Sequence, residues 1–514
     1  MQSQHPLSSN SFWTDNTSTR ADYHSLKGKV EADVAIIGGG ITGMIAALQL
    51  TVAGKKVVIL EADRIAGSTT GFSTGNLYVP LQTKYHKILS DFGKDTVEII
   101  ARSRMEAIDF VERTIRENVI DCQFHRRPWY MYTNNPQNVS IVQDEVKALK
   151  NAGMEIDFVE DMPLNVKYLK AAKMENQARF NPYKFVTELA RILSQQGCLI
   201  YEYSPVVRYE ENDVCTLFTR YGKAAAEYMI EATHIPKGIN MVDTLVYPHR
   251  SYVVAAQINE PYPDGNFWDM DKEPAHAISS HGIKSDNLEM LMFAGNHHKT
   301  GQSDKLYMHH YLEIEEFIDK TYPGAEIKYH WSAQHYTPAD GVAYIGKGGM
   351  GSDKRYMATG FAADGLTYGV VAGIIISNMI TGYDNPWLAA YDSTRIKPIS
   401  SSKEFVMENI NVAMQYIKDY PRFGEVESFS EIDKLEGRTL QLNGEKLAAY
   451  RDGEGEMHVH SAICPHMKCV INWNDAEKTW DCPCHGSRFS INGEVIEGPS
   501  LEPLEKKDVG KEMT

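Results

Sequence analysis

The sequence lacks three features that would place it in a specialised class. Its longest apolar run, Gly369–Ile380, is too short to span a bilayer. The first twenty residues are polar and have no apolar core, so we expect no signal peptide and a cytoplasmic chain. Basic residues are in deficit, with 52 lysines and arginines against 68 acids, and a net charge of −16 argues against nucleic acid or an anionic membrane as the main partner.

Cysteine is scarce, and its distribution is uneven. The 514 residues suggest two to four domains with ample core, yet contain only seven cysteines, four of which lie close together near the C-terminal end. We predict that the other three, Cys122, Cys198 and Cys215, are free thiols.

Those C-terminal cysteines alternate with histidines. Cys464-Pro-His466 is followed, sixteen positions after that histidine, by Cys482-Pro-Cys484-His485. Two thiolates and two imidazoles suit a 2Fe–2S cluster with one iron on Cys464 and Cys482 and the other on His466 and His485. Such a ligand set has a reduction potential of about −150 to +300 mV. A structural zinc site is the competing interpretation, although zinc fingers usually place both cysteines before both histidines.

The two loops resemble the Rieske family of iron–sulfur proteins, and the resemblance extends from about Glu425 to the C-terminus. It implies an all-β domain, a disulfide between Cys469 and Cys484, and a hydrogen bond from Ser487 to a bridging sulfide. Rieske proteins of the cytochrome bc complex have a tyrosine two residues after that serine, where this chain has Phe489. We therefore expect one fewer hydrogen bond to a ligand sulfur and a lower potential than in those proteins.

Residues 33–61 have the pattern of a nucleotide-binding β–α–β unit. An apolar strand leads into Gly38, Gly40 and Gly43, a helical stretch follows, and a second apolar strand ends at Glu61. The first glycine permits a tight turn, the second lets the backbone approach a pyrophosphate, and the third allows close helix–strand packing. The acid can bind a ribose diol. The motif alone does not distinguish NAD from FAD, and a purely structural turn is the alternative.

Three further stretches resemble the D-amino-acid oxidase superfamily of flavoproteins, over about residues 33–391, and imply FAD. The stretch after Glu61 is similar to a second glycine-rich segment beside the flavin; its residues are Gly67, Ser68, Thr69 and Gly71. Residues 181–206 resemble the segment that contacts the adenosine, with Val206 at the contact. Residues 357–367 resemble the loop and helix N-terminus that face the flavin pyrimidine ring; the residues concerned are Gly360, Gly365, Leu366 and Thr367.

Together the resemblances predict the fold class and the domain boundaries. We expect an α/β (α+β) FAD-binding Rossmann-like domain with an antiparallel-sheet substrate domain, followed by an all-β Rieske domain. The oxidoreductase part would span residues 1–395, divided into a Rossmann-like part (30–120, 180–245 and 333–395) and a substrate sheet (about 121–180 and 246–332). A linker helix over 396–424 and the Rieske domain over 425–514 would complete the chain.

The predicted substrate sheet offers polar side chains but no unique constellation. Arg126 and Arg127 could bind a carboxylate in a bidentate manner. The stretches around residues 247–252 and 295–298 could each place a hydrogen-bonding group over the flavin, so the candidate catalytic residues are His297, Arg250 and Tyr252. For each of these, an ordinary position on a sheet face or in a loop is the alternative.

Two positions differ from the sarcosine-oxidase branch of that superfamily. Where the branch has a lysine that speeds the reaction of reduced flavin with oxygen, alignment on Gly295 and His297 places Phe293. Where it has a carboxylate-binding lysine, this chain has Thr367. The first difference favours a dehydrogenase over an oxidase, and the second argues against a simple N-methyl amino acid as the substrate.

The resemblances thus imply a FAD-dependent oxidoreductase acting on CH–NH or CH–NH2 donors. We expect hydride transfer from a small-molecule amine or amino acid to the flavin. Electrons would then pass singly through the Rieske cluster to an external acceptor protein or quinone. Two alternatives stay open: an oxygen-using amine oxidase with a structural cluster, and a non-catalytic redox sensor or electron carrier.

Overall fold

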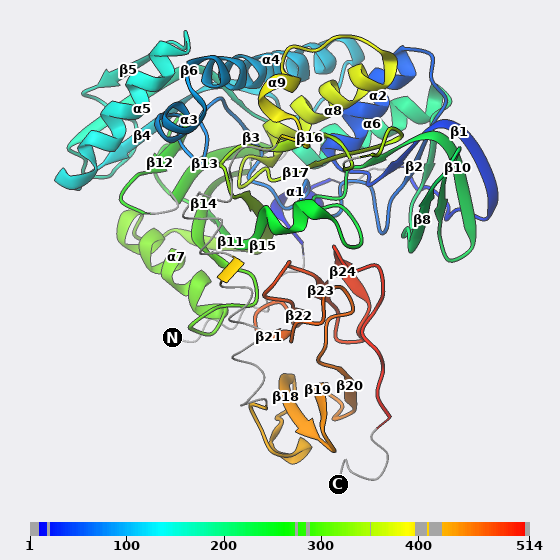
Figure 1. Ribbon diagram of the computed structural model, residues 1–514. Coiled ribbons are helices and arrows are strands. Elements are labelled where there is room, and N and C mark those ends of the chain that lie inside the picture. Colours follow the sequence, from blue (N-terminus) through cyan, green and yellow to red (C-terminus); the bar gives the residue numbers. More distant parts are fainter. Residues whose placement is uncertain are drawn as a thin grey trace.

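The computed structural model describes residues 10–17, 21–272, 276–283, 288–349, 351–395, 409–410 and 424–508. These residues form an α/β part, a large and mainly antiparallel sheet, and an all-β C-terminal region, which confirms the predicted fold class (Figure 1). The linker helix predicted for residues 396–424 lies outside the described residues except at residues 409–410 and 424.

The first sheet forms the nucleotide-binding part and has eight strands among the described residues. Its order is β16-β17-β10-β1-β2-β7, with β9 pairing β10 and β8 pairing β9. Strands β17, β10, β1, β2 and β7 run parallel, whereas β16, β9 and β8 are added in antiparallel pairs. The bounds are β1 (Gly28–Ile37), β2 (Val57–Leu60), β7 (Leu199–Tyr201), β8 (Arg208–Glu211), β9 (Cys215–Phe218), β10 (Gly222–Glu231), β16 (Tyr344–Lys347) and β17 (Arg355–Thr359).

Two buried helices pack closely beside this sheet. α2 (Ile41–Val52) lies against α8 (Gly365–Thr381), and a Cβ added at Gly373 would lie only 2.8 Å from the side chain of Ile45. α8 contains the apolar run at Gly369–Ile380 and is a core helix. None of the helices in the described residues combines the length and apolarity that crossing a membrane requires. The remaining helices are α1 (Phe12–Asp15), α3 (Tyr85–Phe92), α4 (Lys94–Asn118), α5 (Val139–Asn151), α6 (Pro182–Gln195), α7 (Met308–Thr321) and α9 (Leu388–Tyr391).

The second sheet has nine strands in the described part of the chain, in the order β15-β11-β14-β13-β12-β4-β6-β3, with β5 on β6. Neighbours are antiparallel except β12 and β4. One face packs under α7, while the other shares a core with the nucleotide-binding sheet (Figure 1). The bounds are β3 (Asn76–Leu77), β4 (His125–Thr133), β5 (Ile156–Val159), β6 (Lys170–Arg179), β11 (Val246–Gln257), β12 (Asn266–Asp269), β13 (His276–Ile283), β14 (Leu288–Lys299) and β15 (Glu326–Pro338).

The C-terminal region consists of two small antiparallel sheets. The first contains β18 (Glu436–Leu442), β19 (Glu445–Arg451) and β20 (Met457–Ser461). The second contains β21 (Asn472–Asn474), β22 (Thr479–Asp481), β23 (Arg488–Phe489) and β24 (Val495–Glu497). Figure 1 shows the second sheet beside the body of the molecule and the first sheet at the far end. The cysteine- and histidine-containing loops are therefore on the side of the region that meets the rest of the chain.

Candidate functional site

The glycine loop after β1 leads into α2, and two of its positions admit only glycine. Gly38 has a φ of +106°, and a Cβ there would lie 2.5 Å from the carbonyl oxygen of Ala232. A Cβ on Gly43 would lie 2.1 Å from the carbonyl oxygen of Gly38. Gly40 is the N-cap of α2 and brings no side chain to its first N–H groups. This backbone fits the pyrophosphate of a dinucleotide.

The acid at the end of β2 lies beside the same loop. Glu61 accepts a hydrogen bond from the N–H of Gly39 through Oε2, at 2.7 Å, and burial raises the pKa of this carboxyl. Val206 follows β7 and belongs to a buried cluster that contains Ile37 and Leu60. The predicted ribose and adenosine contacts thus lie together at the carboxyl ends of parallel strands, where α/β sheets bind their ligands.

The second glycine-rich segment packs against the first. The N–H of Ala66 donates to the carbonyl oxygen of Gly39, at 3.1 Å. The hydroxyl of Thr69 lies 3.4 Å from Nδ1 of His234, in the segment that follows β10. The predicted residues of this segment are Gly67, Ser68, Thr69 and Gly71. They are therefore close to the nucleotide loop, although their contacts with FAD stay a prediction.

The N-terminus of α8 borders open space. Gly365, Leu366 and Thr367 form its first turn, and Gly360, with a φ of +73°, lies in the preceding loop. A Cβ on Gly365 would meet no atom within 4 Å. The hydroxyl of Thr367 accepts a hydrogen bond from the N–H of Tyr78, at 3.3 Å. Free space at a helix N-terminus fits a flavin ring that becomes negatively charged on reduction.

The three candidate catalytic residues lie on two faces of the second sheet. Tyr252 stacks on His310 of α7, with ring centroids 4.7 Å apart, and its hydroxyl is 2.9 Å from Nε2 of His298. Arg250 forms an ion pair with the C-terminal region. Only His297 lies on the face toward the nucleotide-binding sheet. The catalytic roles of all three stay predictions, and the structure brings them to no common point.

Three histidines gather on the face toward the nucleotide-binding sheet. The rings of His297 and His335 are 5.4 Å apart, and those of His249 and His335 are 5.6 Å apart. Val253, further along the same face of β11, belongs to the core shared with the nucleotide-binding sheet. Burial lowers the pKa of His297 to about 3 and holds the pKa of His335 well below its usual value, so both rings are neutral at pH 7.

Sequence reasoning left His335 without a role, because its position depends on pairing with His249 across β11 and β15. Arg126 and Arg127, by contrast, have ordinary structural partners. The guanidinium of Arg126 pairs with Glu112, at 2.6 Å, and that of Arg127 pairs with Asp264. The alternative of an ordinary sheet-face position fits both arginines better than a carboxylate site does.

Phe293 points to the face of the sheet that packs against α7. Its ring centroid is 6.0 Å from that of Phe317 and 6.1 Å from that of Tyr322. Its identity therefore says nothing about how a flavin on the opposite face reacts with oxygen. The strand neighbours that do face the nucleotide-binding sheet are Met292 and Ala294, and neither is a lysine.

The two cysteine–histidine loops converge in the C-terminal region. Cys464 and Cys482 are buried free thiols within hydrogen-bonding reach of each other. The rings of His466 and His485 are 5.1 Å apart, and Nδ1 of each is buried without a hydrogen-bond partner. Two thiols and two unpaired ring nitrogens facing one another fit the predicted 2Fe–2S cluster, because buried polar atoms otherwise find partners.

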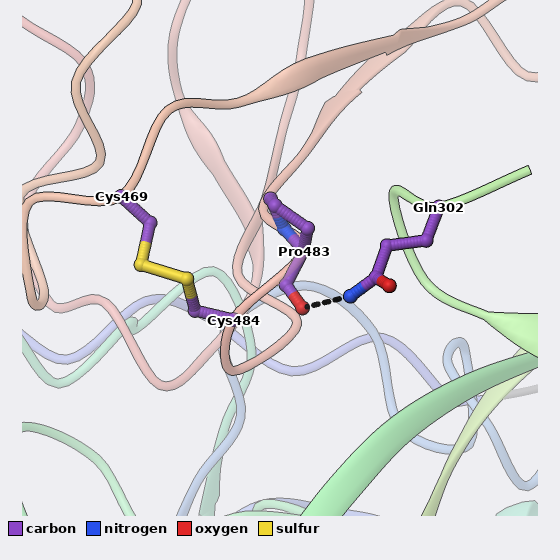
Figure 2. Close-up of a disulfide and its surroundings, with 4 residues drawn as sticks. All are labelled: Gln302, Cys469, Pro483 and Cys484. Atoms are coloured by element: carbon purple, nitrogen blue, oxygen red, sulfur yellow. Dashed lines mark hydrogen bonds between the residues drawn. A yellow bond between two sulfur atoms is a disulfide. The ribbon is translucent and has the colours of Figure 1, made fainter. Parts of the chain in front are cut away.

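Cys469 and Cys484 form the disulfide that the Rieske resemblance implies (Figure 2). Their sulfur atoms and that of Cys482 lie within 4.8 Å of one another, so the disulfide is adjacent to a cluster ligand. The remaining cysteines, Cys122, Cys198 and Cys215, are buried free thiols, as predicted.

The cluster loops dock onto the rest of the chain through backbone groups. Gln334 of β15 donates to the carbonyl oxygen of Gly486, at 2.8 Å, and the hydroxyl of Tyr336 lies 3.4 Å from the carbonyl oxygen of His485. Figure 2 shows Gln302 donating to the carbonyl oxygen of Pro483, at 3.1 Å. The loops therefore face the body of the molecule.

A buried ion network reinforces this interface. Glu477 of the C-terminal region pairs with Arg250 of β11 and, at 2.6 Å, with Arg488 of β23. Arg488 also pairs with Asp481, at 3.0 Å. Burial alone would raise the pKa of Glu477, but the two guanidinium groups hold it at about 2. The carboxylate is thus ionised at every physiological pH, and Arg250 is engaged in domain contact.

Comparison with known proteins agrees with these features. A family model described as FAD dependent oxidoreductase matches residues 33–379, and one described as Rieske [2Fe-2S] domain matches residues 423–508. The chain is 31% identical over 501 residues to the putative Rieske 2Fe-2S iron-sulfur protein YhfW of Bacillus subtilis (strain 168), which covers 97% of each chain. It is 21% identical over 388 residues to gamma-glutamylputrescine oxidoreductase of Escherichia coli (strain K12), covering 72% of this chain and 89% of that one.

Two solved structures share the fold of the N-terminal part. Glycine oxidase from Geobacillus kaustophilus has a TM-score of 0.60 at 16% identity, covering 71% of this chain and 99% of that one. L-proline dehydrogenase from P. horikoshii has a TM-score of 0.59 at 16% identity, covering 72% and 98%. The two matched domains identify FAD and a 2Fe–2S cluster as the cofactors, and the Rieske match decides against zinc.

The surroundings of the cluster predict how two substitutions shift its potential. Ser487 is fully buried and its hydroxyl contacts the thiol of Cys464, while Phe489 is buried without a polar group. Ser487→Ala should lower the midpoint potential and Phe489→Tyr should raise it, each by up to about 59 mV, which is tenfold in a one-electron equilibrium. An EPR-monitored redox titration checks both signs. A wild-type value near +300 mV, the top of the roughly −150 to +300 mV range, would contradict the lower potential expected here.

The neutral histidines predict a loss of stability in mild acid. Because the folded-state pKa values of His297 and His335 lie below the unfolded value, their contribution is complete above about pH 6.5 and declines as the pH falls. The expected loss is about 1.4 kcal/mol per histidine for each pH unit below that point. His335→Gln should therefore show a smaller fall in thermal midpoint between pH 6.5 and 5.5 than the wild type. Equal falls would show that His335 is protonated when folded.

Proposed function

We propose, from the premise that this chain belongs to the FAD-dependent oxidoreductase family and carries a Rieske [2Fe-2S] domain, that it is a dehydrogenase of an amine or amino acid. When bound, FAD supplies a hydride acceptor and the 2Fe–2S cluster supplies a one-electron carrier. The chain itself binds and orients the substrate, and it holds the two cofactor sites in a fixed relation. The electrons leave through the Rieske domain to an external acceptor protein or quinone.

The docking of the cluster loops onto the flavin domain is the observation that carries this proposal. Alternate residues of β15 face opposite sides of the sheet: Gln334 and Tyr336 contact the Rieske loops, and His335 lies between them on the opposite face. The Tyr336 ring is also 4.8 Å from that of His234, which neighbours Thr69. A single strand therefore lies between the Rieske loops and the histidine-lined face, and this closeness supports the proposal of direct electron transfer within one molecule.

Two observations support the proposed substrate class: the solved structures that share this fold, and the histidine-lined face of the second sheet. The names of the solved structures that share this fold refer to glycine oxidase, L-proline dehydrogenase and L-amino acid deaminase. The neutral rings of His297 and His335 can donate or accept hydrogen bonds without adding charge. Hydride transfer from a carbon beside an amine needs orientation more than acid–base help.

An anaerobic substrate screen tests the proposal. The full-length holoenzyme is mixed with a panel of amines and amino acids, and the flavin and cluster absorbance bands are followed together. At least one compound should bleach the flavin, and the cluster should then be reduced at a rate that does not depend on protein concentration. The proposal fails if the cluster stays oxidised while the flavin is fully reduced. Rapid reoxidation of reduced flavin by oxygen would instead favour the oxidase alternative.

Removal of the interface carboxylate should uncouple the two sites. Glu477→Ala removes the nearer of the two carboxylates that pair with Arg250, the other being Glu497 at 4.0 Å, and should weaken docking by up to about 3 kcal/mol. Cluster reduction should slow at least tenfold in stopped-flow traces, while flavin bleaching by the substrate keeps its rate. Glu494→Ala, which removes an exposed carboxylate from the same domain, is the matched control and should change neither rate. Unchanged cluster reduction in Glu477→Ala would argue against transfer through this interface.

A further inference from the structure

A carboxylate of the flavin domain lies against one of the cluster ligands. Asp243 is 2% exposed and sits in a short turn after β10, at Met241–Thr244. Its Oδ2 is 3.4 Å from Nε2 of His466, across the domain interface. The same ring nitrogen lies 3.1 Å from the carbonyl oxygen of Gly238. Two oxygen atoms of the flavin domain therefore surround the outer edge of this imidazole.

The two nitrogens of His466 have different surroundings. Nδ1 is buried without a hydrogen-bond partner, which leaves it available to iron. Nε2 faces a carboxylate and a carbonyl oxygen, and both of these can only accept, so Nε2 carries the proton and donates it. Histidines that bind metals commonly donate their second N–H to such groups, and this raises the basicity of the ligand.

Among the described residues, the carboxylate of Asp243 has no arginine or lysine as an ion-pair partner. Oδ2 accepts a hydrogen bond from the N–H of Asn240, at 2.8 Å, and Oδ1 is buried without a partner. Because both side chains are about 1% exposed, water screens their interaction little.

We propose that Asp243 is a positioning residue of the iron–sulfur site: a carboxylate of the flavin domain that accepts a hydrogen bond from the Nε2–H of His466 and lowers the reduction potential of a cluster held by another domain. Extra electron density on the imidazole stabilises the oxidised iron pair. The potential of the cluster then depends on domain docking, which brings the two groups together. This inference does not require an amine substrate, so it stands or falls separately from the proposed reaction.

The test uses two neutral substitutions in the full-length holoenzyme. Asp243→Asn and Asp243→Ser both keep an oxygen that can accept from the N–H of Asn240, so the turn stays capped. Each should raise the midpoint potential of the cluster by at least about 59 mV, a tenfold change in the ratio of oxidised to reduced cluster at fixed potential. The EPR g values of the reduced cluster should shift, and the flavin potential should not.

A third variant separates the carboxylate from the turn. Thr244→Ala removes an exposed hydroxyl of the same turn, which donates to the carbonyl oxygen of Met241, and leaves Asp243 in place. It should leave the cluster potential unchanged. Iron, sulfide and flavin contents confirm that each variant is loaded. Wild-type potentials in both Asp243 variants, or an equal shift in Thr244→Ala, would overturn the proposal.

Discussion

The arrangement of this molecule depends on one partly buried carboxylate held between two arginines of different domains. Glu477 lies between Arg250, which is 1% exposed on the flavin side, and Arg488 of the Rieske domain. Ionic groups removed from water are costly unless each finds its partner, so the flavin domain alone would leave Arg250 without this carboxylate, whereas Glu477 would keep Arg488. The docked state therefore gives Arg250 a carboxylate partner that it would lose if the domains separated. The relation between the two cofactor sites follows from this contact.

The parts of the fold with local sequence signatures could be predicted, and those that depend on remote pairing could not. The glycine loop and the cysteine–histidine loops each place their chemistry within a few residues, so spacing alone indicated them. Arg250 was expected on the flavin side because the stretch around it is polar, and Phe293 because alignment on Gly295 and His297 places it there. Which face a strand residue occupies, however, depends on the partner strands and on α7. The ion pair of Arg250 joins residues 227 positions apart, which no periodicity reveals.

The second sheet acts as a partition with different chemistry on its two faces. Toward the nucleotide-binding sheet it presents neutral histidines, and toward the Rieske loops it presents Gln334 and Tyr336 together with the guanidinium of Arg250. Alternation along β11 and β15 is enough to produce this difference. A substitution on either strand thus acts on one centre while its immediate neighbour acts on the other.

Burial of the cluster ligands limits the way electrons can leave. His466 and His485 are 8% and 4% exposed, and their loops are turned inward. A protein-sized acceptor cannot touch either imidazole while the domains are docked. Electrons must then pass from the cluster to the acceptor by tunnelling through the outer side of the Rieske domain, or they must leave during transient separation of the domains. In the second case the separation of the domains acts as a kinetic gate, and turnover becomes insensitive to the driving force of the acceptor.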